Sequence, residues 1–290
     1  MNPSSRPEAP PPGSYRDLVR TALAEDVGGG DVTTAAIVPP GTPARGVFLA
    51  KSPCVLAGLP VAREVFAEAD PAIRWNALKS DGDRCTPGDR IAEIDGPAAG
   101  VLRAERTALN FLQHLSGIAT LTRAFVDVAG RLQVLDTRKT IPGLRHLAKY
   151  AVRCGGGGNY RVGLFDGVLI KDNHIRVAGS IAEAVRRVRA AGVALPIEVE
   201  AQSLAEVEQA LSARADVIML DNLDASETAA AVRLIAKRAR VELSGRMTLE
   251  RVRSAAESGA DCVSIGALTH SAPAADISLE IETGVQPAAR

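Results

Sequence analysis

Short apolar runs alternate with amphipathic helical segments through the second half of the chain. Six runs read as strands, and they are RLQVLD, GVLIKD, PIEVE, DVIMLDN, VELSG and DCVSIG. The segments between them, such as IAEAVRRVRAA and LAEVEQALSA, place apolar residues at helical spacing. Regular alternation of strand and helix predicts parallel βα units, which curl into a barrel. We therefore expect an open, TIM-like α/β barrel in this half.

The first hundred residues lack this alternation. Helical patterns in YRDLVRTALAED and LPVAREVFAEAD are mixed with strand-like GVFLAK, IRWNALK and RIAEI, while DVGGGDVTT reads as a polar loop. Such a mixture predicts an α+β sandwich. A long helical pattern starts at Val101, with a bend expected near Ser116 and Gly117. The last pattern, DISLEIE, reads as a strand that could return to the N-terminal unit.

These patterns divide the chain into three expected parts. Residues 1–13 are Pro-rich and are predicted to be a disordered tail. Residues 14–115 should form the N-terminal α+β domain, joined by a strand within 276–290, and residues 116–275 should form the barrel domain. The expected fold class is therefore α/β, with an α+β sandwich domain followed by an open barrel.

Composition narrows the classes of function. The chain has 34 Lys and Arg residues against 34 Asp and Glu residues, so neither a nucleic-acid surface nor a polybasic membrane patch is expected. No apolar run reaches membrane-spanning length, and residues 1–13 lack the apolar core of a signal peptide. The four cysteines are far apart and form no CxxC pair, which is typical of reduced thiols in a cytoplasmic protein.

The ends of the predicted strands carry the polar residues. In a βα barrel the carboxyl ends of the strands converge on one face, where ligands bind. Because cations gathered at strand ends need anions to face, we expect a cavity for a small ligand with carboxylates or phosphates. The strand ends are cationic, acidic or glycine-containing, and they are Asp136-Thr137-Arg138-Lys139, Lys171, Glu200, Asp221, Ser244-Gly245 and Gly266.

Two kinds of strand end suggest a phosphorylated sugar. Glycine lets an anion approach backbone N–H groups, so Ser244-Gly245 and Gly266 indicate a phosphate site, with simple tight turns as the alternative. Glu200 and Asp221 could hold ribose hydroxyls or a magnesium ion carried by a diphosphate, or stabilise positive charge on a sugar carbon. Ion pairing with neighbouring lysines is the alternative. Glu198 should also face inward, at a deeper position than Glu200, where it is expected to be buried and paired with a cation.

Several long motifs follow one another in a specific order. They are LAEDVGGGDVTT, AERTALNFLQHLSGIATLTR, DTRKTIPGLRHLAKYAVRCGGGGN, RVGLFDGVLIKDNHI, IEVE, DVIMLDN and GALTHSAPAADISLEI. In these motifs the chain resembles the quinolinate phosphoribosyltransferase family over almost everything after residue 14. The resemblance implies a homodimer whose subunits have an α/β N-terminal domain and an open barrel. It also implies magnesium-dependent transfer of phosphoribosyl from 5-phosphoribosyl 1-diphosphate (PRPP) to quinolinate, giving nicotinate mononucleotide, diphosphate and carbon dioxide.

The resemblance also implies roles for individual residues. Arg106 of AERTALN resembles the arginine that one subunit lends to its partner's site. Arg138 and Arg161 resemble the arginines that hold the quinolinate carboxylates, while Lys139 and Lys171 resemble the lysines that face substrate and diphosphate. The remaining implied contacts are Glu200 and Asp221 with ribose and metal, and Ser244, Gly245 and Gly266 with the 5-phosphate. Thr137, Tyr160 and Arg246 are further candidates for substrate binding. Of these residues, the implied catalytic set is Lys139, Lys171, Glu200 and Asp221.

This chain departs from the family pattern at two positions. Tyr160 stands where the family usually has a histidine in NHR. A phenol can donate to a carboxylate but cannot carry positive charge, so we expect a weaker hold on quinolinate, with packing on an apolar wall as the alternative. Arg246 makes SGR of the usual SGG, and either reaches the ribose phosphate or faces solvent. Of the histidines, His174 is expected to bond the loop after its strand, and His270 is a weaker phosphate candidate.

Two other functions stay open on the sequence. A paralogous enzyme of the same fold could act on another anionic acceptor, and Tyr160 is the feature that keeps this alternative alive. A non-catalytic barrel could bind a phosphorylated metabolite and signal through a partner. The joint presence of Lys139 and Lys171 with Glu200 and Asp221 favours an enzyme, because a sensor would not need lysines that face diphosphate.

Overall fold

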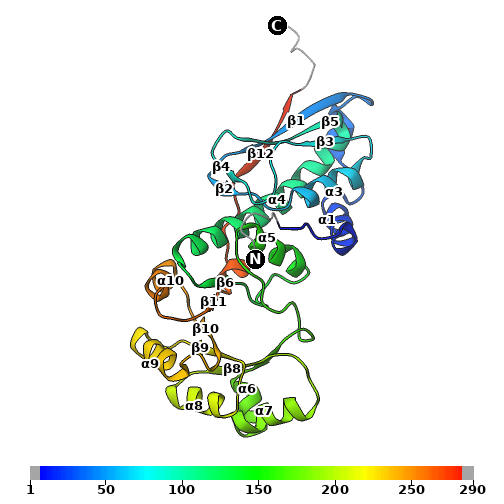
Figure 1. The fold of residues 1–290 in the computed structure, drawn as a ribbon. Helices are drawn as coiled ribbons and strands as arrows, with labels where there is room; N and C mark the ends of the chain where they lie inside the picture. Colours follow the sequence, from blue (N-terminus) through cyan, green and yellow to red (C-terminus); the bar gives the residue numbers. More distant parts are fainter. Residues whose placement is uncertain (1–6, 283–290) are drawn as a thin grey trace. The chain divides into compact units, whose positions relative to one another are not determined.

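The computed structural model describes residues 7–282, and residues 1–6 and 283–290 lie outside the described part (Figure 1). It divides into two compact units. The first unit takes in the described residues up to Arg123, the segment Ile141–Gly156, and the residues from Ser271 onward. The second unit consists of Ala124–Thr140 and Gly157–His270. The chain therefore passes between the units several times, where the sequence suggested one boundary near residue 115 and a returning strand.

The first unit is built on an antiparallel sheet of four strands in the order β12-β1-β5-β3. The strands are β1 (Pro43–Ala50), β3 (Arg74–Ala77), β5 (Arg90–Pro97) and β12 (Ile277–Glu282). A small ladder pairs β2 (Cys54–Val55) with β4 (Arg84–Cys85). β12 pairs with β1, so the return of DISLEIE to the N-terminal unit is confirmed. The rest of the expected 276–290 segment, from residue 283, lies outside the described residues.

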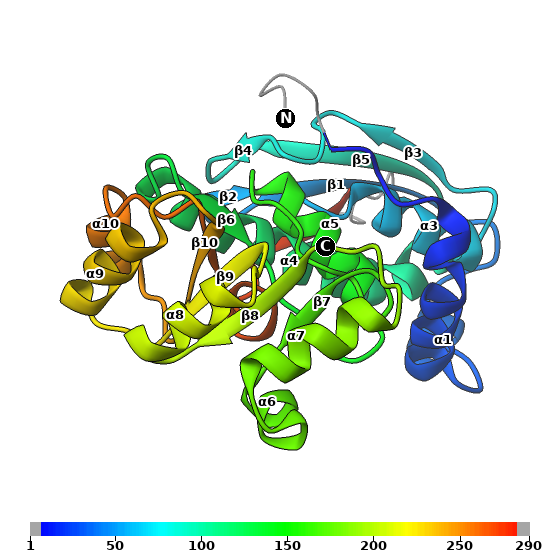
Figure 2. The same cartoon turned by 60° about the horizontal axis from the view of Figure 1, so that its bottom comes forward.

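Helices lie along one face of this sheet (Figures 1 and 2). Phe48 of β1, Phe66 of α3 (Leu59–Ala69) and Trp75 of β3 form an aromatic cluster with ring centroids 5.3–5.9 Å apart, which joins sheet and helix. The long helix α4 (Ala98–Val128) continues without interruption through Ser116 and Gly117, and its last residues belong to the second unit. The helices are α1 (Arg16–Val27), α2 (Val32–Ile37), α3 (Leu59–Ala69), α4 (Ala98–Val128) and α5 (Arg145–Cys154).

Two local expectations for the first unit need revision. The segment DVGGGDVTT is not all loop, because its end forms α2. The Asp31 side chain caps this helix by accepting from the Thr34 N–H at 2.9 Å, a signal that the preceding glycines obscured. Of the predicted disordered tail, residues 1–6 lie outside the described part, while Pro12–Ser14 form a 3-10 turn, η1, leading into α1.

The second unit is a sheet of six parallel strands in the order β6-β11-β10-β9-β8-β7. The strands are β6 (Gln133–Leu135), β7 (Val168–Ile170), β8 (Ile197–Ala201), β9 (Val217–Asp221), β10 (Arg240–Ser244) and β11 (Cys262–Ser264). β6 and β7 are its two edge strands, and a bridge from Leu135 to Gly158 lies on the free edge of β6. The open α/β barrel expected from the sequence is thus confirmed.

Helices follow the strands of this sheet (Figure 2). They are α6 (Asp172–Ala178), α7 (Ile181–Ala190), α8 (Leu204–Ser212), α9 (Ala225–Ile235), α10 (Leu249–Ala255) and α11 (Ala267–His270). Ser180, Ser203, Asp224 and Thr248 cap α7 to α10 with a side-chain oxygen. These caps fix where each helix begins, and therefore how long each loop at the strand ends is.

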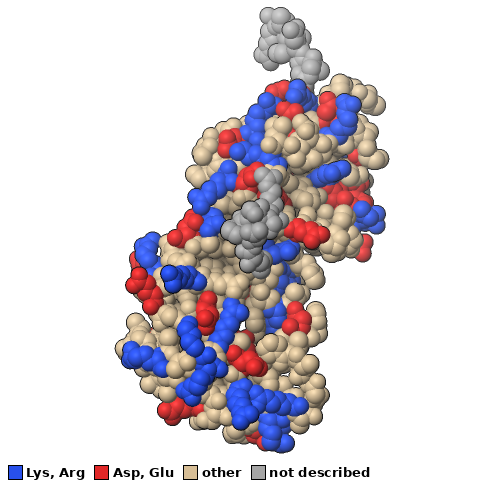
Figure 3. Space-filling model, in the orientation of Figure 1, with Lys and Arg blue, Asp and Glu red and all other residues tan. Residues whose placement is uncertain are grey.

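Charges of both signs occur on the face of each unit that Figure 3 shows, as the balanced composition suggests. No helix within residues 7–282 has the length and apolarity that a bilayer crossing requires.

Candidate functional site

The carboxyl ends of the six parallel strands line one cavity of about 460 Å³ in the second unit. Side chains two residues apart along a strand point to the same face. Each of the six strand ends therefore places one polar side chain on the cavity wall. These residues are Thr137 after β6, Lys171 after β7, Glu200 on β8, Asp221 on β9, Ser244 on β10 and Ser264 on β11. Lys139, Gly245, Arg246 and Gly266 line the same cavity.

A second cavity of about 280 Å³ adjoins the first, and the two share wall residues. The shared residues are Thr137, Lys139, Lys171, Ser244 and Ser264. Arg138, Tyr160 and Arg161 line only the second cavity. One step deeper along the strands, Leu169, Met219 and Glu242 complete the wall. The second unit therefore offers a place for two ligands in contact, with two lysines between them.

The cations of this pair of cavities are only partly neutralised. Lys171 Nζ lies 2.7 Å from Glu200 Oε2, so the alternative of ion pairing holds for this glutamate. Asp221 accepts from the neighbouring Asn222 amide at 2.9 Å. Lys139 Nζ has no hydrogen-bond or ion-pair partner within residues 7–282. An unpaired ammonium at the junction of two cavities favours an anionic ligand there.

Two of the strand ends have a glycine packed close to other side chains, and at Gly245 the backbone itself favours glycine. Gly245 has φ of +94°, and an added Cβ would lie 2.3 Å from Asn222 Oδ1. A Cβ on Gly266 would lie 2.9 Å from Lys139 Cδ and 3.2 Å from His270 Nε2. The space at these turns is therefore filled by side chains that themselves line the cavity. Gly245 and Gly266 themselves line the cavity, so the backbone of both turns lies at its wall, as a phosphate site requires.

Asp136 organises the segment that carries Tyr160 and Arg161. This residue is fully buried, and its carboxylate accepts from Asn159 Nδ2 at 2.6 Å and from the Tyr160 N–H at 2.9 Å. Gly158 donates its N–H to Val134 O at 2.7 Å, which joins the same segment to β6. From the sequence, Asp136 was expected only as part of a polar strand end, and its place after an apolar run was the signal for this role.

Tyr160 is bonded to a buried carboxyl group beneath the smaller cavity. Its hydroxyl donates a short hydrogen bond to Glu198, and the Arg161 guanidinium lies 5.8 Å from its ring centroid. Glu198 is buried, as expected. The expected partner was a cation, but the Tyr160 phenol and the Glu242 carboxyl also act on Glu198, in addition to Arg161. Burial, with Glu242 beside it, raises the pKa of Glu198 to about 8. Burial also raises the pKa of Glu242.

This carboxyl pair was not found from the sequence. Glu198 and Glu242 come from β8 and β10, with β9 between them, so no local pattern links them. Side chains from alternate strands share a layer inside a barrel. One oxygen of each carboxyl, Oε1, is buried without a hydrogen-bond partner among the described residues.

The other predicted residues occupy the following places. Arg106 lies on α4 in the first unit with an exposed side chain. His174 Nδ1 accepts from the Lys171 N–H at 3.0 Å, so its predicted structural role at the start of α6 is confirmed. His270 lines the larger cavity of the second unit.

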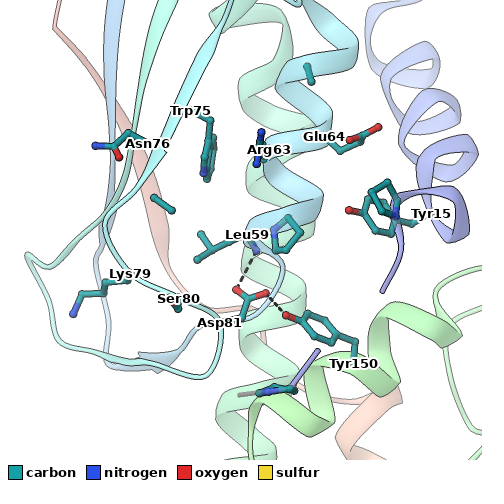
Figure 4. Close-up of a pocket in the computed structure, with 15 residues that line it drawn as sticks. Tyr15, Leu59, Arg63, Glu64, Trp75, Asn76, Lys79, Ser80, Asp81 and Tyr150 are labelled. Carbon is teal, nitrogen blue, oxygen red and sulfur yellow. Dashed lines mark hydrogen bonds between the residues drawn. The ribbon is translucent and has the colours of Figure 1, made fainter. Parts of the chain in front are cut away.

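A cavity of about 690 Å³ lies within the first unit and was not anticipated (Figure 4). Asp81 is at its base, and its carboxylate accepts from Gly58 N at 2.9 Å, Leu59 N at 3.1 Å and Tyr150 Oη at 2.7 Å. The bond from Tyr150 joins α5 to the first unit, to which this helix belongs although it follows β6 in the chain. Burial raises the pKa of Asp81 in spite of these three bonds.

Comparisons with known proteins agree with this architecture. Residues 31–116 match the quinolinate phosphoribosyl transferase N-terminal domain, and residues 118–280 match the C-terminal domain of that family. A nicotinate-nucleotide pyrophosphorylase (carboxylating) of Mycobacterium leprae is 44% identical over 92% of this chain and 96% of its own length. The chloroplastic enzyme of that name from Oryza sativa is 42% identical over 96% of this chain and 81% of its own length.

Solved structures give the same result. The crystal structure of NadC from Streptococcus pyogenes aligns with a TM-score of 0.92 at 42% identity, over 95% of this chain and 99% of that one. A nicotinate-nucleotide pyrophosphorylase from Francisella tularensis aligns with a TM-score of 0.91 at 39% identity, over 96% of this chain and all of that one. Both domains, in the same order and at this identity, match one family. The chain therefore belongs to the quinolinate phosphoribosyltransferase family.

Proposed function

We propose that this enzyme transfers phosphoribosyl from PRPP to quinolinate, giving nicotinate mononucleotide, diphosphate and carbon dioxide. The observation that carries the proposal is the pair of adjoining cavities with Lys139 and Lys171 in their common wall. A transfer between two anionic substrates needs two anion sites in contact. The relatives named above are pyrophosphorylases and carboxylating enzymes, which agrees with this reaction.

The larger cavity suits the phosphoribosyl donor. Ser244, Gly245 and Gly266 would hold the 5-phosphate, and Lys139 and Lys171 would face the diphosphate. Lysine suits a mobile, rotating phosphate group because its charge is a compact point. Glu200 and Asp221 lie at neighbouring strand ends and would stabilise the positive charge that builds on the ribose carbon as diphosphate leaves. Neither carboxylate needs to bond covalently to the sugar.

The smaller cavity suits a flat dicarboxylate. The guanidinium groups of Arg138 and Arg161 can each form two parallel hydrogen bonds to a carboxylate. Thr137 adds a hydroxyl at the junction with the donor cavity. Because a phenol carries no positive charge, the cations lining this cavity are Arg138, Arg161 and the two lysines.

The reaction needs positioning more than acid–base chemistry. The pyridine nitrogen carries no proton, so no general base has to act before it attacks the ribose carbon. Once the nitrogen is alkylated, the ring is a pyridinium, and its positive nitrogen stabilises the electron pair left on the adjacent carbon when that carbon's carboxylate leaves as carbon dioxide. This carbon then takes up a proton from solvent, which gives the C–H bond of nicotinate mononucleotide. Holding both substrates in contact and neutralising their charge would supply most of the rate increase.

The acidic pair fits magnesium bound mainly through the substrate. Carboxylate oxygens are ligands that Mg²⁺ prefers, and Mg²⁺ commonly binds through one or two carboxylates plus phosphate oxygens. Within residues 7–282 no group of three or more His, Cys, Asp or Glu residues could enclose a metal. Glu200 and Asp221 would therefore share the ion with the diphosphate, and the ion would neutralise the charge of the leaving group.

The assembly and location belong to the same proposal. A homodimer in which Arg106 reaches the partner's site would use the exposed position of this arginine on α4. Four free cysteines, all buried, support a cytoplasmic setting in which thiols stay reduced. Sedimentation and a mixing test would examine the dimer. Arg106→Ala mixed with Lys139→Ala should regain part of the activity that each variant lacks, since one site in the mixed dimer is intact.

The reaction itself is tested with purified protein, PRPP, Mg²⁺ and quinolinate. We expect carbon dioxide and nicotinate mononucleotide in equal amounts. Product formed equally well from other pyridine or benzene carboxylates would favour a paralogous transferase, for which Tyr160 is the one suggestive feature. Binding of PRPP without any product would favour a non-catalytic phosphometabolite-binding barrel.

A further inference from the structure

Arg246 holds a backbone conformation that residues with a Cβ rarely adopt. Its φ is +38°, and it directly follows Gly245 at φ +94°. The left-handed region crowds the Cβ of an L-residue against the backbone, so a glycine would be more stable at this position. A strained residue at a cavity wall suggests a functional reason for the side chain.

The turn is held in this conformation by its neighbours. Arg251 of α10 donates Nη1 to Gly245 O at 3.2 Å and to Arg246 O at 3.4 Å, and Nη2 to Leu223 O at 3.4 Å. Asn222 occupies the space beside Gly245. Because both carbonyls of the turn bond to Arg251, the backbone of Arg246 is fixed by contacts outside the residue itself.

The side chain of Arg246 is exposed on the wall of the larger cavity of the second unit. Its guanidinium has no hydrogen-bond or ion-pair partner in the part of the chain that the structure describes. Lys171, by contrast, is already paired with Glu200 across the cavity. Arg246 therefore brings an uncompensated charge to the β10 end of the cavity, next to the glycine turn.

We propose that Arg246 binds the sugar phosphate of the donor and determines how tightly this enzyme holds it. The guanidinium would receive the terminal phosphate monoester through two parallel hydrogen bonds, beside the backbone of Gly245 and Gly266. Arg251 acts as a positioning residue, because it holds the strained turn but does not line the cavity. The identity of the donor in this proposal rests on the proposed function. The binding of a phosphate group rests on the cavity alone.

The test compares Arg246→Ala, Arg246→Gly and Arg246→Lys with Arg253→Ala, an exposed arginine of the same helix as Arg251 that serves as the control. The dissociation constant for ribose 5-phosphate is measured by calorimetry at two salt concentrations. The KM for PRPP, the KM for quinolinate and the Tm are measured in parallel.

Arg246→Ala should weaken ribose 5-phosphate binding and raise the KM for PRPP by about ten- to a hundredfold, as expected for lost hydrogen bonds to a charged group. The KM for quinolinate should change by less than about twofold. Arg246→Gly should show the same loss together with a higher Tm than the natural chain, because glycine is unstrained at this φ. Arg246→Lys should retain part of the affinity, since a single ammonium cannot form the paired bonds.

Three results would overturn the proposal. They are ribose 5-phosphate binding unchanged in Arg246→Ala, an equal loss in Arg253→Ala, and failure of the natural chain to bind ribose 5-phosphate at all. If the natural chain binds ribose 5-phosphate through Arg246 but makes no product from quinolinate, the proposed function fails while this inference stands.

Discussion

The cavity of the first unit and the pair of cavities of the second unit differ in how their charged groups are satisfied. In the first unit, Asp81 is bonded to two backbone N–H groups and a phenol, and Glu64 is paired with Arg16 at 2.5 Å. In the second unit, Lys139 and Arg246 face the cavity with no side-chain partner among the described residues. Of these three cavities the largest single one is in the first unit. It also has one cation without a side-chain partner among the described residues, Arg63. The gathering of several cations at strand ends, rather than size, therefore identifies the site.

The largest effect is expected at Lys139, where a substitution tests the difference between the two sites directly. Lys139→Ala should lower kcat/KM by about 10²–10³-fold, because an ammonium aimed at the leaving diphosphate is lost from the junction of the two cavities. Arg63→Ala removes an exposed cation from the wall of the first unit's cavity and should leave kcat/KM within about twofold. Steady-state kinetics with PRPP and quinolinate makes the measurement. Equal losses in both variants would show that the two cavities were wrongly distinguished.

A stability measurement makes the complementary comparison in the first unit. Asp81→Asn should lower the free energy of unfolding by about 3 kcal/mol, because the amide cannot accept from two N–H groups and a hydroxyl as the carboxylate does. Denaturant unfolding followed by circular dichroism gives the value. Asp17→Asn, at a fully exposed side chain, is the control. If Asp81→Asn unfolds like the natural chain, then the bonds at the base of this cavity are not structural.

The carboxyl pair beneath the acceptor cavity predicts a pH dependence. Burial raises the folded-state pKa of Glu242 and, to about 8, that of Glu198. The folded protein thus holds protons that the unfolded chain releases above about pH 4.5, so stability falls as pH rises toward 8. Glu242→Gln removes one titrating group and should reduce that fall by at most about 1.4 kcal/mol per pH unit.

Thermal unfolding between pH 5 and pH 9 would measure this difference. The Tm of Glu242→Gln should decline less steeply than that of the natural chain, and Glu250→Gln, exposed on α10, should not alter the slope. Parallel curves for all three proteins would mean that the pair does not retain a proton.

The smallest effect concerns acceptor binding. Tyr160→His would place on the acceptor wall an imidazole, which can carry a positive charge that a phenol cannot. An added positive charge on the acceptor wall should lower the KM for quinolinate about three- to tenfold, equivalent to roughly 1 kcal/mol. Tyr160→Phe, which removes only the hydroxyl, is the matched control and should not tighten binding. A KM for Tyr160→His that is unchanged or higher would count against the expected role of this substitution.

The sequence by itself determined the barrel and most of the larger cavity in the second unit. Thr137, Lys171, Glu200, Asp221 and Ser244 were each predicted from one local pattern, an apolar run that ends in a polar residue. Parallel strands joined by helices bring their carboxyl ends together whatever the details of packing. Side chains two residues apart share a face, so the same pattern also indicated which residues point inward.

Only the tertiary structure decided how these residues are held. Asp136 binds the segment of Tyr160 through contacts about 24 residues away in the chain, and Glu198 meets Glu242 across an intervening strand. α5 is bonded to the rest of the first unit through Tyr150 and Asp81, which are 69 residues apart. Such partners depend on strand order and on the paths of loops, which no local periodicity encodes. Local patterns therefore fix which side chains face a cavity, and long-range packing fixes what each of them contacts.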